Sequence, residues 1–218
     1  MPPSRTFSRY LLSLAGLFFM GLGIGLVTRS HLGTPPISSV PYVLSRIFPV
    51  TYGEFAFLLG VLFVLLEVLI LGREFPRERF LQVFVGLVLG VFIDLGMVIS
   101  VFAAPERYLE EVLTLVLGCA VLALGVYMMV SADTLLHPAD AVVKLLARKT
   151  GTRFGTMKIC FDASLCCAAA LVSFAAFGTV TGLGEGTIVS ALLVGSIVTA
   201  IGAVFARLSG SVRPPPDR

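Results

Sequence analysis

The sequence predicts an all-α polytopic membrane protein with six transmembrane helices, arranged as two inverted three-helix repeats that each contain a short re-entrant or interfacial half-helix. Three observations lead to this prediction. Of the 218 residues, 57% are hydrophobic and only 13% are charged, whereas about a quarter of the residues of soluble domains are charged. Six apolar runs are long enough to cross a bilayer, and the chain aligns with itself at a constant offset. This composition argues against a soluble enzyme, a nucleic-acid-binding protein and a secreted disulfide scaffold.

The six apolar runs are each close to the roughly 20 residues that a helix needs to cross the hydrocarbon core. They cover residues 11–27, 55–71, 80–103, 112–130, 159–177 and 188–205. Each run ends in charged or turn-forming residues, as expected where a helix leaves the bilayer. The first run follows Arg5 and Arg9, as a signal sequence would, but it is long for such a segment and has no Ala-x-Ala cleavage site. We therefore expect it to be retained as a span.

The basic residues fall mainly on one side of the predicted spans. With the N-terminus in the cytoplasm, only Arg29, Arg46 and Arg107 lie outside, and the other 13 of the 16 Lys and Arg residues, including Arg213 and Arg218, lie inside. Short cytoplasmic loops are typically enriched in Lys and Arg. The pattern therefore predicts a multi-pass protein of the bacterial cytoplasmic membrane with both termini in the cytoplasm.

An internal repeat relates the two halves of the chain. An ungapped shift of 102 positions places Gly25 on Tyr127, Pro36 on Pro138, Arg46 on Arg148 and Gly53 on Gly155. Each half reads as a span, a hydrophilic break, a short apolar stretch that begins at a proline, a turn that ends in glycine, and two further spans. Because three spans per half is an odd number, the halves must have opposite orientations in the membrane. The predicted repeats are residues 1–108 and 109–218.

The short apolar stretches, residues 37–47 and 139–148, are interpreted as half-helices. Each has about 10 residues, or about 15 Å of helix, which is too short to span a bilayer. Pro36 and Pro138 suit the first helical turn, where a missing N–H is tolerated. Ser38, Ser39 and Asp140 lie in the opening turn, where short polar side chains help to satisfy unpaired N–H groups.

In an inverted pair, two half-helices can enter from opposite faces and direct their N-termini at a shared central site. The candidate substrate-binding residues on this hypothesis are Thr34, Pro36, Ser38, Ser39 and Asp140. The alternative is a pair of amphipathic helices lying flat at the interface, anchored by Arg46 and Arg148.

Ionisable residues inside spans are costly in hydrocarbon and are therefore functional candidates. Asp94, 14 residues beyond Phe80, is expected to lie within the membrane core without a basic partner on its own helix, and it is the first candidate for proton or ion coupling. Asp162 is the second, although an ion pair with Lys158 at the i,i+4 spacing is an equally open explanation. Glu67 is expected to extend toward the inner interface.

Histidines and glycines near these segments have simpler interpretations. His31 and His137 flank the two half-helices, where a loop, capping or pH-sensing role is open for each. The spacings Gly21-x-x-x-Gly25 and Gly86-x-x-x-Gly90 are expected to allow close helix packing. No metal-binding or cofactor-binding spacing is present in the sequence, so neither a metal nor a cofactor is predicted.

Several short motifs in a fixed order resemble the YczE/YyaS/YitT type of bacterial integral membrane protein. The glycine-rich segment GIGL at 23–26 and the turn LGTPP at 32–36 are shared features of that type. FID at 92–94, PAD at 138–140 and GLGEGT at 182–187 resemble its YczE branch in particular. The resemblance covers nearly the whole chain and implies a polytopic inner-membrane protein, but it implies no settled biochemical activity.

Two classes of function are compatible with these features. The first is a secondary transporter or carrier of a small solute bound at the repeat interface, with proton coupling through Asp94 as an option. An anionic solute group would suit half-helix N-termini. The second is a membrane regulatory or scaffold protein that recruits a cytosolic partner through the basic loop from Lys144 to Arg153. An enzyme is not expected. The predicted partners are the lipid bilayer and a small-molecule solute, with a homodimer or cytosolic protein as alternatives and no nucleic acid.

Overall fold

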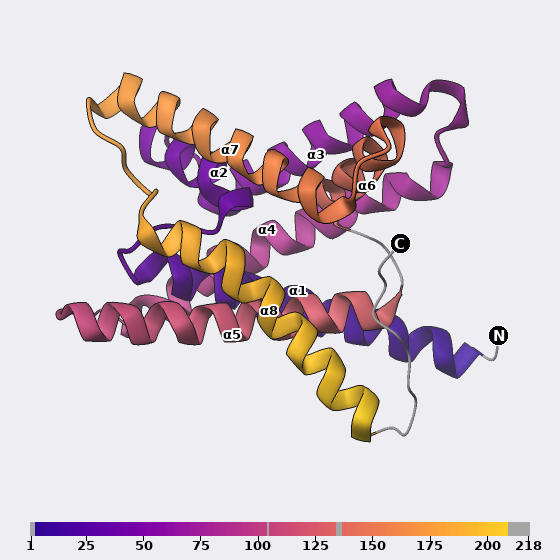
Figure 1. Ribbon diagram of the computed structural model, residues 1–218, viewed down its shortest axis with the longest axis horizontal. Helices are drawn as coiled ribbons and strands as arrows, with labels where there is room; N and C mark the ends of the chain where they lie inside the picture. Colours follow the sequence, from indigo (N-terminus) through magenta and orange to yellow (C-terminus); the bar gives the residue numbers. More distant parts are fainter. Residues whose placement is uncertain (1–2, 104, 134–136, 209–218) are drawn as a thin grey trace.

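The fold is described from a computed structural model, which describes residues 3–103, 105–133 and 137–208. These residues form eight α-helices, joined in places by short 3₁₀ turns, and contain no β-strand (Figure 1). The helices are α1 (Pro3–Arg29), α2 (Pro36–Ile47), α3 (Tyr52–Leu71), α4 (Leu81–Ile99), α5 (Tyr108–Ala132), α6 (Pro138–Thr150), α7 (Phe154–Phe177) and α8 (Glu185–Leu208).

Six helical segments are long and apolar enough to cross a membrane, and they match the six predicted spans. They cover Phe7–Arg29, Tyr52–Glu74, Arg77–Phe102, Tyr108–Ala132, Phe154–Phe177 and Glu185–Arg207. All six begin earlier than predicted because polar residues at the ends still belong to the helix. At the start of α3, for example, the Glu54 N–H donates to Thr51 Oγ1 at 3.1 Å, and the Thr51 N–H donates to Glu54 Oε2 at 2.8 Å. This reciprocal pair is a capping box.

Helix α1 packs between α4 and α5 through glycines on two of its faces. A Cβ added at Gly21 would lie 2.4 Å from the backbone of Phe92 in α4. One added at Gly23 would lie 2.4 Å from the backbone of Leu122 in α5. Both distances are far below van der Waals contact, so only glycine permits these helix separations. The packing role predicted for the glycines near position 21 is confirmed, and α1 joins α4 to α5.

The two halves of the chain differ in how their last two spans pack. Helices α3 and α4 form a tight hairpin, in which a Cβ at Gly53 would lie 1.9 Å from the Gly90 carbonyl oxygen. Helices α7 and α8, which follow α6, instead diverge from their connecting loop (Figure 1). Gly155, aligned with Gly53 by the repeat, has no atom within 4 Å of an added Cβ.

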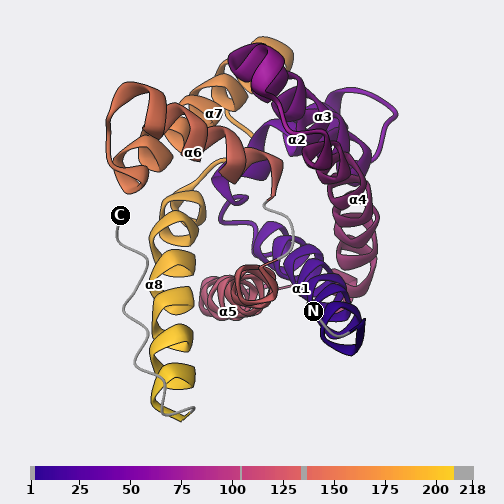
Figure 2. The same ribbon diagram turned by 90° about the vertical axis from the view of Figure 1, so that its right-hand side faces the viewer.

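The two half-helices are present and lie among the spans. Helix α2 packs against α3 and α7, and α6 packs against α7 and α3, so that each half-helix also contacts the other half of the chain (Figure 2). Ala139 and Val142 of α6 form a buried cluster with Phe63 of α3. The observed bounds of α2 and α6 agree with the predicted 37–47 and 139–148 within two residues at each end.

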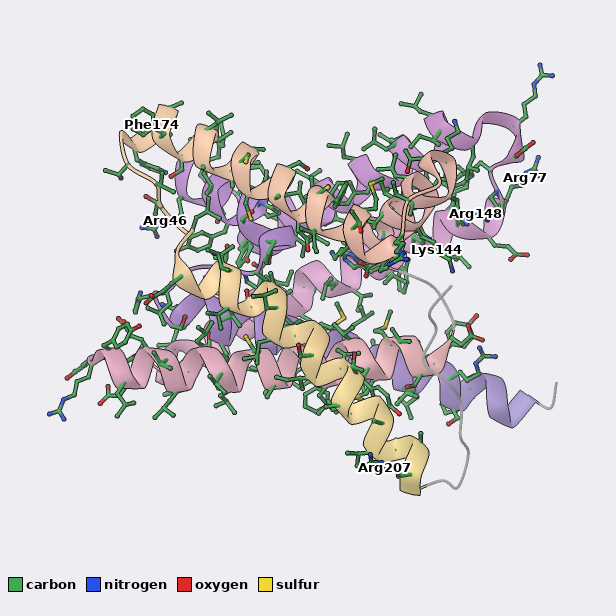
Figure 3. All side chains as sticks on the ribbon, in the orientation of Figure 1. Arg46, Arg77, Lys144, Arg148, Phe174 and Arg207 are labelled. Atoms are coloured by element: carbon green, nitrogen blue, oxygen red, sulfur yellow. The ribbon has the colours of Figure 1, made fainter. Side chains whose placement is uncertain are left out.

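Basic side chains gather at one end of the bundle. Arg77, Lys144 and Arg148 lie at one end, and Arg46 lies at the opposite end (Figure 3). The described start of α1 is on the same side as the first group (Figure 1). Arg213 and Arg218, which the charge pattern places inside, are outside the described residues.

Candidate functional site

Both half-helices begin at a buried proline in the middle of the bundle. Pro36 and Pro138 occupy the first turns of α2 and α6, as predicted, and both side chains are buried. Neither helix has a side-chain hydrogen bond that caps its N-terminus. The first N–H groups of a helix carry partial positive charge, so an uncapped start can interact with an anion or a polar group.

The beginnings of both half-helices line one small cavity of about 30 Å³. Ile37 and Ser38 approach it from α2, and His137, the residue before α6, approaches it from the other half of the chain. The remaining walls come from α1, α3 and α4, with Ile24, Gly60 and Ile93 among their lining residues. A volume of this size holds about one or two waters. We call it the central cavity.

Pro41 is a lining residue that sequence reasoning did not single out. It lies inside α2, is fully buried and faces the central cavity. A proline within a helix has no N–H, so the carbonyl of Ile37, four residues earlier, lacks its helical donor. Pro41 is visible in the sequence, but only the structure shows that Ile37 and Pro41 both line the cavity.

The other predicted residues of the first half-helix have local partners. Ser38 Oγ donates to the Pro35 carbonyl at 3.2 Å, and Ser39 Oγ donates to the Pro36 carbonyl at 2.6 Å. Among the predicted residues of this segment, Ser38 therefore lies at the cavity and Ser39 does not line it.

Thr34 joins two loops that are distant in the sequence. Its N–H and its hydroxyl both donate to the Gly182 carbonyl at 3.0 Å, and the Gly186 N–H donates to the Leu32 carbonyl at 2.8 Å. The motifs LGTPP and GLGEGT are thus in direct contact. Gly184 must be glycine, since a Cβ there would lie 2.3 Å from the Leu32 carbonyl oxygen. Thr34 holds the loops together and does not line the central cavity.

Asp140 and Asp162 share one lysine. Lys158 Nζ lies 3.0 Å from Asp162 Oδ1 on the same helix and 3.5 Å from Asp140 Oδ1 on α6. Of the two explanations for Asp162, the structure shows the i,i+4 ion pair. Asp140, predicted to bind substrate, lies in this triad and does not line the central cavity. The triad links the start of α6 to α7.

Asp94 has no basic partner among the described residues, but it is hydrogen-bonded to the start of α3. Its Oδ2 accepts a hydrogen bond from Thr51 Oγ1 at 2.6 Å, and its Oδ1 accepts one from the Gly53 N–H at 2.7 Å. These partners are the first residues of α3, so Asp94 lies level with one end of that helix. A carboxylate at a helix N-terminus is stabilised by the helix dipole. The sequence could not predict these hydrogen bonds, because Thr51 and Gly53 are more than 40 residues from Asp94 and lie at the start of another helix.

Glu67 is buried and pairs with Arg79, a residue that the charge pattern places on the inner side. Its side chain has 0% exposure, and its Oε2 pairs with Arg79 Nη1 at 2.6 Å. The second oxygen, Oε1, is buried without a hydrogen-bond partner among the described residues. The pair joins α3 to the turn before α4.

Burial of His137 is expected to make the stability of the protein depend on pH. Burial lowers the pKa of its imidazole, the Asp140 carboxylate acts in the opposite direction, and the Lys158 ammonium lowers the pKa further. The unfolded chain should therefore bind the proton more readily than the folded chain, and we expect stability to fall as the pH drops below about 6.5.

We expect His137→Asn to reduce the loss of thermal stability between pH 7.5 and 5.5, measured on protein in detergent. His31→Asn is the control, because His31 is the other histidine of the chain and is exposed. A pH dependence unchanged by His137→Asn would show that other groups cause it.

The fold is that of a polytopic α-helical membrane protein. It has six candidate spans and two half-helices, α2 and α6, that both begin at the central cavity. The chain belongs to the family of unknown function DUF6198, whose model matches residues 7–203. It is 29% identical to the uncharacterized membrane protein YczE of Bacillus subtilis (strain 168) over 191 residues, which cover 87% of this chain and 83% of that protein. The resemblance to the YczE type is thus confirmed. No solved structure matches the chain.

Proposed function

We propose that the protein is a secondary transporter or carrier of a small, anionic solute that binds at the central cavity, between two inverted repeats in the bacterial cytoplasmic membrane. The observation that carries the proposal is the meeting of two uncapped half-helix N-termini at one buried cavity. In carriers built from inverted repeats, broken helices supply such a site near the middle of the membrane.

The packing between the two halves of the chain supports the proposal that they are repeats with opposite orientations in the membrane. Helix α2 packs on α7, and the equivalent pair under the repeat, α6 and α3, also packs together. Helices α1 and α5, the first spans of the halves, lie side by side and run in opposite directions (Figure 1). The small volume of the cavity means that solute binding requires the halves to move apart, as alternating access does. On this proposal both termini lie in the cytoplasm.

The test is uptake into proteoliposomes that contain the purified protein, with a pH gradient, across a panel of small organic acids and inorganic phosphate. We expect at least one of these anions to accumulate. Asp94→Asn should abolish the part of uptake that the pH gradient drives, since an amide cannot exchange a proton. The fold should persist, because the Asn oxygen can accept from Gly53 and its NH₂ can donate to Thr51.

Glu54→Gln is the matched control for this experiment. It removes a carboxylate from the same helix start but keeps the capping box, in which glutamine also serves, so gradient-driven uptake should be unchanged. Equal uptake by wild type and Asp94→Asn would show that Asp94 has only a structural role. Absence of uptake for the whole panel would favour the regulatory or scaffold alternative, for which the exposed basic side chains of Lys144, Arg148 and Arg153 are the docking candidates.

A further inference from the structure

A second, larger pocket opens where α1 ends and α3 begins. Its volume is about 270 Å³, and it lies at the end of the bundle that carries Arg46, away from Arg77 and Lys144 (Figure 3). Polar and aromatic side chains make up most of the wall, among them Thr28, Arg29, Tyr42, Arg46, Thr51 and Tyr52. We call it the terminal pocket. Two of the three basic residues that the charge pattern places outside line it.

Both arginines in the wall have unused hydrogen-bonding capacity. Arg46 is exposed and makes no hydrogen bond or ion pair with the rest of the described chain. Arg29 is half-buried, and its side chain makes one hydrogen bond within the described residues, a long one of 3.4 Å from Nη2 to the Met97 carbonyl. The Arg29 Nε is buried without a partner among the described residues. A buried donor without an acceptor is costly, so this N–H favours a ligand that accepts a hydrogen bond.

The wall also contains a buried tyrosine hydroxyl. The Tyr52 side chain is 5% exposed, and no hydrogen bond to its hydroxyl is present in the described part of the chain. The hydroxyls of Thr28 and Ser38 lie beside it, but they donate to the Ile24 and Pro35 carbonyls. The Tyr52 O–H can donate to one of these hydroxyl oxygens or to an acceptor group of a ligand in the pocket.

The carboxylates near the pocket are already occupied. Asp94 accepts from the Thr51 hydroxyl and the Gly53 N–H, and Glu54 accepts from the Thr51 N–H. These contacts also use the start of α3, so that helix end is not open to a ligand. Neither carboxylate lines the pocket, whereas both guanidinium groups do, so the wall itself favours an anion.

We propose that the terminal pocket binds the carboxylate or phosphate group of a small solute, held by Arg29 and Arg46 with a hydrogen bond from Tyr52. The planar fork of a guanidinium matches both groups in a bidentate manner. The volume is close to the lower limit of small-molecule sites, which suits a ligand of a few carbon atoms.

The pocket is next to the central cavity. Tyr52 lines the terminal pocket, Ser38 lines the central cavity, and the hydroxyls of these residues are neighbours. If the protein is a carrier, the terminal pocket would be a first binding position for a solute that enters from this end of the bundle. Its part in uptake rests on the proposed carrier function, whereas anion binding itself does not.

The test is isothermal titration calorimetry of the purified full chain in detergent at low ionic strength, with sodium succinate and inorganic phosphate as probes. We expect saturable binding of at least one probe to wild type. Arg46→Gln should weaken it by about tenfold or more, as expected for loss of a charge-assisted bidentate contact. Arg46 has no partner within the described structure, so the variant should fold normally. Arg107→Gln, which removes the third outer basic residue at the start of α5, should bind like wild type.

Tyr52→Phe is a second variant that keeps the aromatic packing and removes only the hydroxyl, and it should weaken binding several-fold. The proposal is overturned if neither probe binds wild type saturably, or if Arg46→Gln and Tyr52→Phe both bind as wild type does. Binding that depends on Arg46 without uptake of the same anion would uphold the site and contradict the carrier function.

Discussion

Gly53→Ala is expected to destabilise the protein strongly, because its methyl group has no space. The added Cβ would lie 1.9 Å from the Gly90 carbonyl oxygen and 2.8 Å from the carboxyl carbon of Asp94. The first neighbour is backbone, which cannot move aside as a flexible side chain can, so α3 and α4 must separate. Overpacking of this kind costs typically up to about 3 kcal/mol. We expect a loss of about 10 °C in the melting temperature of the detergent-solubilised protein, with less monodisperse protein on gel filtration.

Gly155→Ala is the matched control, since the internal repeat aligns it with Gly53 and its added Cβ meets no atom within 4 Å. It should leave the melting temperature unchanged or raise it slightly, because alanine favours helix over glycine. Similar melting temperatures for the two variants would contradict the close packing of α3 on α4.

Arg79→Gln is expected to be the most damaging single change of charge in the described chain. It would leave the Glu67 carboxylate, which is fully buried, without its cation. Removal of one partner of a buried ion pair costs about 3 kcal/mol or more, because the remaining charge is uncompensated. The melting temperature and the yield of folded protein should both fall. Arg77→Gln, two residues earlier at an exposed position, should have little effect (Figure 3).

The double variant Glu67→Gln with Arg79→Gln separates the loss of charge balance from the loss of packing. It removes both charges and keeps two groups that can hydrogen-bond, so it should be more stable than Arg79→Gln alone. If the double variant were no better than the single one, packing by the arginine side chain would be its main contribution, and the pairing with Glu67 would be minor.

The lengths of the apolar runs predict the spans because the bilayer sets the length and composition of each spanning segment separately. A helix must carry about 20 apolar residues wherever it crosses, and it satisfies its own backbone, so its length is set within its own sequence. The half-helices were predictable for a similar local reason. Pro36 and Pro138 determine where α2 and α6 begin, since proline is tolerated in the first turn and disfavoured further along.

The candidate site could be predicted only in part. The sequence indicated that the two half-helices begin near functional positions, and Ser38 does line the central cavity. Asp140 was also singled out, but its ion pair with Lys158 depends on the packing of α6 against α7. The terminal pocket was not predicted, because Arg29 and Arg46 are on different helices and appeared only as outer basic residues.

The sequence by itself determined the number of spans, the positions of the half-helices and the membership of the chain in its family, since these depend on local composition and on the order of short motifs. Only the tertiary structure decided which polar groups meet. Asp94 is bound by the start of α3, and Glu67 by Arg79. The physical reason is that hydrogen bonds and ion pairs act over about 3 Å between side chains, so their partners depend on how the helices pack.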